Sequence, residues 1–497
     1  MEGMRRWRAC AGAARAPLEE EKKVTPRPIH PRVLSFFPLS LPVQSTNLLL
    51  EAGDAALRSG PAAVPDLAAL AAVAKLHRDT AAALGVPPAT VAEVEALLAQ
   101  LTQLLVGVAI VQELTPRARD ALVSFGERLS TRLFTAYLTR LGVPAVQADA
   151  CGEGWVTTTD EFGSADVDYG ATLPALAARC APGAHPPGTV LVLTGFLGRG
   201  ARTGAITTLG RGGSDLTAVL TGAALLVPGG AVREVVVWKD VDGVLTGDPR
   251  LVGHDAARPV PALTYDEATE LAFFGAAVLH PLAMQPAMLA PAGGAHPGLA
   301  VRVKNSYNTA APGTVIARTR PGADEAGGWA GTAPPPPPPP VSSVVLKDNV
   351  TLVDASSPRA SGGIGFLAGV FAVFRDAGLS VDVVATSEVS VSITLDPARL
   401  WERDLVEAEL DALKASLASS AGAAAVTVTR GVGCVSLICD VGRTCAILER
   451  AFRVLGGAGV PVLMVSQGAS KTNISLIVGG EGAGRTAAKA LHDEFFG

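Results

Sequence analysis

The stretch TTLGRGGSDLTAVL (207–220) decides how this chain folds. It follows an apolar run, VLVL (190–193), which is bounded by Pro187-Gly188 and Gly195 and is typical of a buried parallel strand. After the glycines, Ser214-Asp215 resembles a helix N-cap, and the apolar residues that follow have helical spacing. The pattern predicts a strand, a glycine-rich turn and the start of a helix.

A turn of this kind can bind anions, because free backbone N–H groups and the helix dipole converge there. Arg211 adds a planar guanidinium suited to a carboxylate or phosphate, and Asp215 adds a carboxylate suited to an ammonium group. Together they fit the phosphorylation of an amino acid. A tight structural turn, with Arg211 and Asp215 paired to each other, fits the local pattern equally well. The stretch is not a Walker motif, because no GKS or GKT follows the glycines.

Length and composition indicate a globular protein with several domains. The 497 residues are 48% apolar and 18% charged, and the net charge of -5 gives no basic surface for nucleic acid. The six cysteines form neither a metal-ligand spacing nor a disulfide framework, which favours a reducing compartment. Prolines and histidines interrupt the longest uncharged stretch, 271–301, so the sequence predicts no membrane span. The negative net charge predicts no nucleic-acid partner.

Residues 1–44 differ from the rest of the chain and are predicted to be an atypical, disordered or wrongly assigned segment, without a strand-like alternation or a clear transit peptide. Helices are predicted at 48–57, 67–84 and 91–112, and another is expected to open with SFGERLST (124–131) and run to about residue 141. Glu127 would then lie in a first turn, where the helix dipole alone explains a carboxylate.

A second strand, REVVVW (233–238), leads into the charged loop KDVDGVLTGDPR (239–250). Charged groups at the carboxyl end of such a strand lie where open α/β sheets bind ligands. Alternating helices and apolar strands predict a mainly parallel α/β domain over residues 45–320. The segment 321–341, with seven consecutive prolines, predicts a spacer and a domain boundary.

Beyond the spacer the chain repeats itself at an offset of 81 residues. GLSVDVV (378–384) matches GVPVLMV (459–465), and VSITL (391–395) matches TNISL (472–476). Each copy follows an amphipathic helix, so two α+β units are predicted, at 342–425 and 426–497. Asp382 stands where the second copy has Leu463. It is either a solvent-facing residue or a receptor for the cation of a small ligand held by the first copy.

These segments together resemble the plant-type, monofunctional, lysine-sensitive aspartate kinases, which join an amino acid kinase domain to tandem, ferredoxin-like ACT domains. The resemblance covers nearly everything from residue 46 onward. The matching motifs are TNLLL (46–50), SFGERLST (124–131), TGFLGRG (194–200), TTLGRGGSDLTA (207–218), VWKDVDGVLTGDPR (237–250), YDEATELAFFGAAVLHP (265–281), VRVKNSYNTAAPGT (301–314), SVDVVATSEVSVSITLD (380–396) and VSQGASKTNISLIV (465–478).

The resemblance implies transfer of the ATP γ-phosphoryl group to the β-carboxylate of L-aspartate, with Mg2+ as the metal on the phosphates. By motif, the catalytic residues would be Arg211, holding the α-carboxylate, and Glu127 and Asp215, on the ammonium side. Gly212, Gly213 and Ser214 would line the aspartate site, and Lys239, Asp240, Asp242 and Arg250 would bound the ATP pocket. No metal ligand is predicted among the side chains.

The ACT resemblance implies feedback by lysine, bound near Gly365, Phe366, Asp382 and Thr386, with S-adenosylmethionine as a candidate second effector. It also implies a homo-oligomer formed through the ACT domains, a plastid location and a place at the start of lysine, threonine and methionine biosynthesis.

Two departures stand against the family pattern. Ala277 replaces a cation or amide that relatives place at the ATP site, and the first strand with its KFGG-type lysine motif is not found before Thr46. The second departure predicts a poorly soluble or inactive kinase and favours an alternative, a non-catalytic lysine-binding protein with a degenerate kinase domain. A kinase for another amino acid, such as glutamate, is a third reading, opposed by the tandem repeats and the KDVDGV run.

Overall fold

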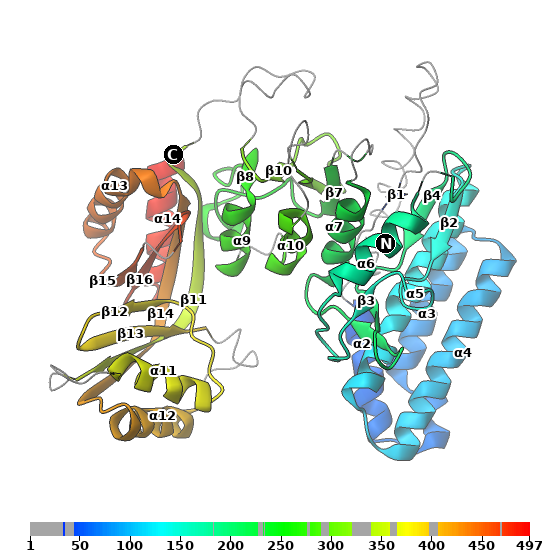
Figure 1. The fold of residues 1–497 in the computed structure, drawn as a ribbon, viewed down its shortest axis with the longest axis horizontal. Coiled ribbons are helices and arrows are strands. Elements are labelled where there is room, and N and C mark those ends of the chain that lie inside the picture. The colour runs from blue at the N-terminus through cyan, green and yellow to red at the C-terminus, as the bar shows by residue number, and fades with distance from the viewer. Residues whose placement is uncertain are drawn as a thin grey trace. The chain divides into compact units, whose positions relative to one another are not determined.

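The computed structural model describes residues 33–34, 44–181, 183–226, 232, 234–275, 279–289, 298–320, 339–357, 365–396, 406–467 and 470–497. Ala277, most of the predicted 321–341 spacer and nearly all of residues 1–44 lie outside these ranges. The chain divides into two compact units, one of Met1–Gly243 with Val278–Arg320 and one of Val244–Ala277 with Pro321–Gly497. Figure 1 labels the helices and strands that make up each unit. This division differs from the predicted boundary near residue 320, since residues 244–277 group with the C-terminal part.

The first unit begins with a cluster of helices around one apolar core. They are α2 (Gln44–Leu57), η1 (Pro61–Asp66), α3 (Ala68–Leu84), α4 (Pro88–Val111) and α5 (Pro116–Arg140). Leu49, Leu105, Leu129 and Phe134 are almost fully buried in this core. Within the described residues α4 alone has the length and apolar composition that crossing a membrane requires, but core helices pass the same test, and its buried residues belong to this cluster.

The predicted start of α5 was wrong. The helix begins at Pro116, after Thr115 accepts a hydrogen bond from the backbone N–H of Ala118 as its N-cap. Glu127 therefore lies near the middle of a 25-residue helix. The helix-dipole explanation for this carboxylate is excluded, because that effect falls off within the first turn.

Three short sheets complete the first unit. β4 (Val190–Leu193), buried along its whole length, pairs in parallel with β2 (Ala145–Ala148) and with β1 (Val33–Leu34). β5 (Leu197–Gly200) lies between β3 (Thr157–Thr158) and β6 (Ile206–Thr208), and β9 (Ala300–Asn305) pairs in parallel with β7 (Glu234–Lys239) and antiparallel with β10 (Thr314–Ala317). α7 (Gly213–Leu225) packs against α6 (Tyr169–Arg179) and α10 (Pro281–Leu289).

β1 is a departure from the sequence prediction, which expected no strand before Thr46. Val33–Leu34 pairs with Leu191 and Val192 of β4. Two residues are too few to display the alternation by which a strand is read from sequence, so the pattern gave no signal here.

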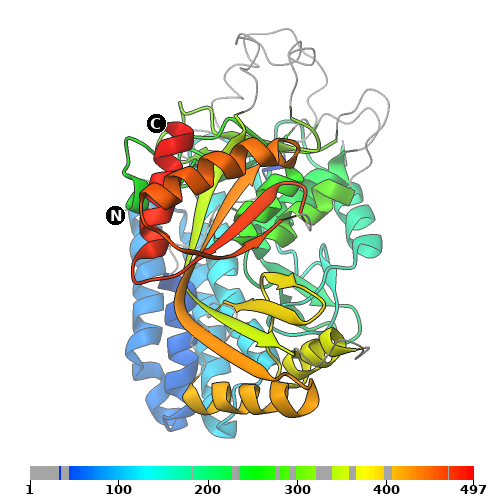
Figure 2. The same cartoon turned by 90° about the vertical axis from the view of Figure 1, so that its left-hand side faces the viewer.

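The second unit is built on a six-stranded antiparallel sheet with the order β12-β13-β11-β14-β16-β15. Its strands are β11 (Val341–Ser356), β12 (Val384–Thr386), β13 (Ser390–Leu395), β14 (Ala425–Cys439), β15 (Val462–Ser466) and β16 (Asn473–Val478). Its helices α11 (Phe366–Asp376) and α12 (Glu407–Ser420) lie at one end of the sheet, and α13 (Thr444–Gly457) and α14 (Ala483–Phe496) lie at the other (Figure 2).

The predicted repeat is present, because α11, β12 and β13 recur as α13, β15 and β16. The two copies interlock. β11 and β14 run the whole height of the sheet, so the beginning of β11 packs with α13 and α14, whereas its end packs with α11 and α12. Val344, which the prediction assigned to the first repeat, therefore lies in the core of the second.

Residues 244–275 form α8 (Pro249–Val252), β8 (Ala262–Thr264) and α9 (Tyr265–Phe273), and they form hydrogen bonds to the second repeat. The backbone N–H of Val344 donates to the carbonyl oxygen of Thr246, whose hydroxyl lies 2.9 Å from Nε2 of buried His492. Ser342 donates to the carboxylate of Glu267 in α9. These bonds explain why the segment groups with the C-terminal unit.

Candidate active site

The glycines before α7 are required by close packing. Gly210 and Gly212 have φ of 70° and 72°, in the left-handed region that side chains disfavour. A Cβ on Gly212 would lie 2.2 Å from Cβ of His280, and one on Gly213 would lie 2.9 Å from Phe196. Gly212 is the N-cap, so Ser214-Asp215 falls in the first turn of the helix instead of capping it, as the sequence had suggested. The turn therefore packs closely against His280 and Phe196.

Thr217 fixes this turn to the loop after β4. Its hydroxyl accepts a hydrogen bond of 3.2 Å from the backbone N–H of Phe196 and donates one of 2.9 Å to the carbonyl oxygen of Gly213. Phe196 has a φ of 67°, which is unusual for a bulky residue. Such strain persists where the surroundings determine the backbone, and it is common at binding sites.

Asp215 forms an ion pair with Lys239 at the end of β7. The two side chains are 2.7 Å apart and only 7% and 18% exposed. Burial raises the pKa of Asp215, and the ammonium of Lys239 opposes that rise. The sequence had offered Arg211 as a partner of Asp215 and had not predicted this pair with Lys239. Lys239, predicted for the ATP pocket, and Asp215, predicted for the aspartate pocket, therefore meet at one point.

Glu127 lies beside the first turn of α7. The hydroxyl of Ser214 donates to its carboxylate over 3.4 Å. Burial raises the pKa of Glu127 to about 8, and the bond from Ser214 opposes the rise. The carboxyl group is therefore mostly protonated at neutral pH.

Asp242 is held by two amides that the sequence did not single out. Asn305 Nδ2 and Asn308 Nδ2 donate to its Oδ1 over 2.8 and 3.1 Å. The backbone and hydroxyl of Ser306 both donate to the carbonyl oxygen of Lys239, which joins the ends of β7 and β9. The only signal for these residues was the motif VRVKNSYNTAAPGT (301–314), whose asparagines follow a strand.

The remaining predicted residues are dispersed. Arg211 is exposed on the glycine turn, close enough for its charge to lower the pKa of His280, for which burial is the larger cause. Asp240 is exposed just after β7. Arg250 belongs to the second compact unit, where its guanidinium pairs with Asp248 at 2.7 Å. His280 was missed, although it stands in the quoted motif that ends in VLHP.

The predicted effector residues lie in the first repeat. Gly365 is the N-cap of α11 with a φ of 109°, Phe366 contributes to the core, and Thr386 is exposed on β12. Asp382 is not solvent-facing, which removes that alternative, because its side chain is fully buried and pairs with Lys347 at 2.9 Å. The sequence did not indicate Lys347.

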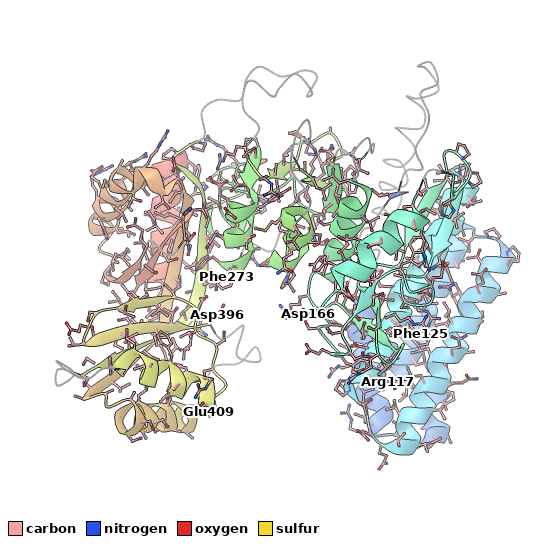
Figure 3. All side chains as sticks on the ribbon, viewed as in Figure 1. Arg117, Phe125, Asp166, Phe273, Asp396 and Glu409 are labelled. Atoms are coloured by element: carbon pink, nitrogen blue, oxygen red, sulfur yellow. The ribbon has the colours of Figure 1, made fainter. Side chains whose placement is uncertain are left out.

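The ammonium of Lys347 is surrounded by two carboxylates and two aromatic rings. Its ammonium is also 3.1 Å from Asp396, and it lies 5.1 and 5.0 Å from the ring centres of Phe273 and Phe274. Phe273 and Asp396 are labelled in Figure 3. The end of α9 and the first repeat thus share one buried cation.

Comparison with known proteins agrees with this architecture. Residues 50–292 match the amino acid kinase family, and residues 441–495 match an ACT domain. The class is therefore an amino acid kinase joined to ACT repeats, as the sequence predicted.

Particular relatives narrow the class. The chain is 47% identical to Aspartokinase 1, chloroplastic, of Arabidopsis thaliana over 92% of its own length and 74% of that protein. It is 32% identical to Lysine-sensitive aspartokinase 3 of Escherichia coli over 81% of each. The chain belongs to the aspartokinase family and is of the plant type.

Solved structures agree. Aspartokinase III of E. coli with aspartate and ADP (R-state) superposes with a TM-score of 0.68 at 32% identity, covering 91% of each chain. The same protein with lysine and aspartate (T-state) gives 0.67. The aspartate kinase of Clostridium acetobutylicum, 18% identical, shares the fold with a TM-score of 0.69.

Proposed function

We propose that this chain transfers the γ-phosphoryl group of ATP to the β-carboxylate of L-aspartate, giving 4-phospho-L-aspartate. The observation that carries the proposal is the buried pair of Asp215 and Lys239 at the start of α7, behind a turn that only glycine fits. A lysine ammonium held rigidly beside a helix N-terminus is a site for phosphate oxygens. The reaction would open lysine, threonine and methionine biosynthesis.

Each predicted residue has a role in this proposal. Arg211, exposed on the turn, binds the α-carboxylate of aspartate, and Glu127 takes its ammonium with Asp215 nearby. Gly212, Gly213 and Ser214 line the substrate, and the residues that bound the nucleotide are Lys239, Asp240, Asp242 and Arg250. The pairing revises one role: Asp215 also orients Lys239, which neutralises phosphate charge.

The proposed reaction is an in-line transfer of one phosphoryl group. A β-carboxylate oxygen of aspartate forms a bond to the γ-phosphorus while the bond from that phosphorus to the β,γ-bridging oxygen breaks, and ADP leaves. Such transfers depend on positioning and on neutralising charge at the phosphoryl oxygens. The aligned ammonium of Lys239 serves the second need.

Mg2+ fits the site as a partner of the nucleotide. Among the described residues no group of three histidine, cysteine or acidic side chains could form a protein cage for a metal. Mg2+ is commonly held by phosphate oxygens with one or two carboxylates. Asp240, exposed just after β7, would be such a carboxylate, a role that the sequence motifs did not assign to it. When bound, the ion would supply charge neutralisation on the phosphates.

Regulation by lysine at the first ACT repeat is part of the proposal. The buried carboxylate of Asp382 supports it, with Gly365 and Phe366 at the start of α11 and Thr386 at the end of β12. Crystals of the E. coli relative with lysine and aspartate point the same way. We also propose a homo-oligomer through the ACT repeats, S-adenosylmethionine as a second effector, and a plastid location in keeping with the chloroplastic relatives.

One assay tests the proposal against its rivals. Purified protein is given ATP with aspartate or with glutamate, and acyl phosphate is trapped as the hydroxamate. Aspartate-dependent product is expected, in contrast to the inactivity predicted from the missing KFGG-type lysine, because the Lys239 ammonium supplies positive charge at the start of α7. Lys239→Met should abolish the product, while Lys414→Met, on α12, should not. Lysine binding without turnover would favour the non-catalytic ACT protein, and turnover of glutamate would indicate a different amino acid kinase.

A further inference from the structure

Lys347 occupies a site whose carboxylates and aromatic rings would also bind the ammonium group of a free lysine. Its side chain is 9% exposed and contacts Asp382, whose side chain is fully buried, and Asp396, which is 13% exposed. Two phenyl rings complete the surroundings, an arrangement that favours an alkyl ammonium by charge and by cation–π attraction. The ammonium of Lys347 therefore already occupies this site.

An added amine at Asp382 must contend with this occupant. Removing one partner from a buried ion pair is strongly destabilising, so loss of the Lys347 ammonium from Asp382 is favoured only when another cation replaces it. The contact of 2.9 Å between Lys347 and Asp382 leaves no gap between them for a second ammonium. An external amine that takes the position of Lys347 on Oδ2 of Asp382 requires the ammonium of Lys347 to withdraw toward Asp396 or solvent.

Withdrawal of Lys347 would remove a cation–π contact from the end of α9. Phe274 is buried against the sheet among Val350, Leu352, Val383 and Met464. Its ring and that of Phe273 meet edge to face at 5.6 Å, and both contact the ammonium of Lys347. This segment follows in the chain from the proposed nucleotide residues 239–242 and carries Arg250.

We propose that Lys347 is a tethered competitor for the effector lysine. The amine of the effector displaces the ammonium of Lys347 from Asp382, and the loss of that ammonium from Phe273 and Phe274 frees the end of α9. Binding in the first repeat is thereby transmitted to residues 244–277. This inference rests on the proposed binding of lysine at Asp382.

The first test is lysine binding by calorimetry on the full chain. Lys347→Met keeps the aliphatic stem but removes the competitor, so lysine affinity should rise about tenfold or more, as expected when a largely occupied site is vacated. Lys347→Arg keeps a competing cation and should show little gain. Lys414→Met, on α12 of the same repeat, is the matched control and should leave lysine affinity unchanged. Unchanged or weaker binding in folded Lys347→Met overturns the proposal.

A second measurement needs no variant and decides the matter if Lys347→Met does not fold. Amide hydrogen exchange of residues 273–275 should accelerate when lysine is added to the unmodified chain. Slower or unchanged exchange there, with lysine bound, contradicts the proposed release.

Asp382→Asn separates failure of this inference from failure of the proposed function. If Asp382→Asn binds lysine as well as the unmodified chain does, the effector site itself is misassigned. If it loses binding but Lys347→Met gains nothing, the effector site stands and the tethered competition is wrong.

Discussion

Glu127 is a carboxyl group that burial keeps protonated near neutral pH, since its pKa is raised to about 8. An ammonium arriving beside it would favour the ionised form and lower that pKa. We therefore predict that binding of aspartate at pH 7 releases a proton. Calorimetry in two buffers of different ionisation enthalpy measures this release, and Glu127→Gln should abolish the difference between the buffers. Proton-neutral binding in the unmodified chain would remove Glu127 from the ammonium site.

The raised pKa of Glu127 also makes the free energy of unfolding depend on pH. A carboxyl whose pKa is higher in the folded state contributes stability below its unfolded pKa, and that contribution is lost as pH rises through the folded value. For Glu127 the loss falls between about pH 4.5 and 8. Glu127→Gln should flatten the pH dependence of the free energy of unfolding over this window, as measured by urea titration. A steeper dependence in the variant would contradict the assignment.

Arg211 is the second residue whose role a single substitution can isolate. Arg211→Lys keeps the positive charge but cannot form two parallel bonds to a carboxylate. The half-saturating concentration of aspartate should rise by an amount corresponding to about 2 kcal/mol, while that of ATP changes little. Steady-state kinetics with each substrate varied in turn measure both. An equal rise for both substrates would show that Arg211 does not read the α-carboxylate.

At the scale of the element, the start of α7 depends on Gly212. It has a φ of 72° and lies against His280. Gly482 is a matched control, because it too is a helix N-cap, with a φ of 68°, and nothing lies within 4 Å of its added Cβ. Gly482→Ala should cost only the left-handed conformation, about 1 kcal/mol. Gly212→Ala should lower stability further, as measured by denaturant unfolding, and impair aspartate use. Equal costs at both sites would show that the contact with His280 is unimportant.

The elements that could be predicted are those whose own residues carry a recognisable sequence pattern. The buried run of β4, the glycine turn and the repeated strands of the C-terminal unit all carry their own pattern. The start of α5 was missed because its N-cap, Thr115 before Pro116, precedes a charged stretch without apolar periodicity. β1 was missed because two residues form no pattern.

Pairings that join distant segments could not be read in the same way. Lys239 and Asp215 were both selected, but they lie 24 residues apart, one at the end of β7 and one in α7, and nothing local specifies their contact. Lys347 was overlooked because Asp382 was compared only with its counterpart Leu463, whereas its partner lies 35 residues upstream on β11. The packing of separate elements decides such contacts, and the sequence does not display that packing.

At the scale of the whole molecule, two compact units with separate cores predict that unfolding is not a single two-state event. Leu105 lies in the helical core of the first unit and Leu455 in the core of the second repeat, both almost fully buried. Replacing a buried leucine by alanine costs about 2–5 kcal/mol, which corresponds to a shift on the order of 5 °C or more.

Scanning calorimetry should therefore show two transitions that respond to different changes. Leu105→Ala should lower one midpoint and Leu455→Ala the other. A ligand stabilises the unit that binds it, so aspartate with ADP should raise the transition that Leu105→Ala lowers, and lysine should raise the transition that Leu455→Ala lowers. A single transition that both variants shift equally would mean that the two units unfold together. In that case lysine bound to one unit would also protect the other, which the same ligand titrations would reveal.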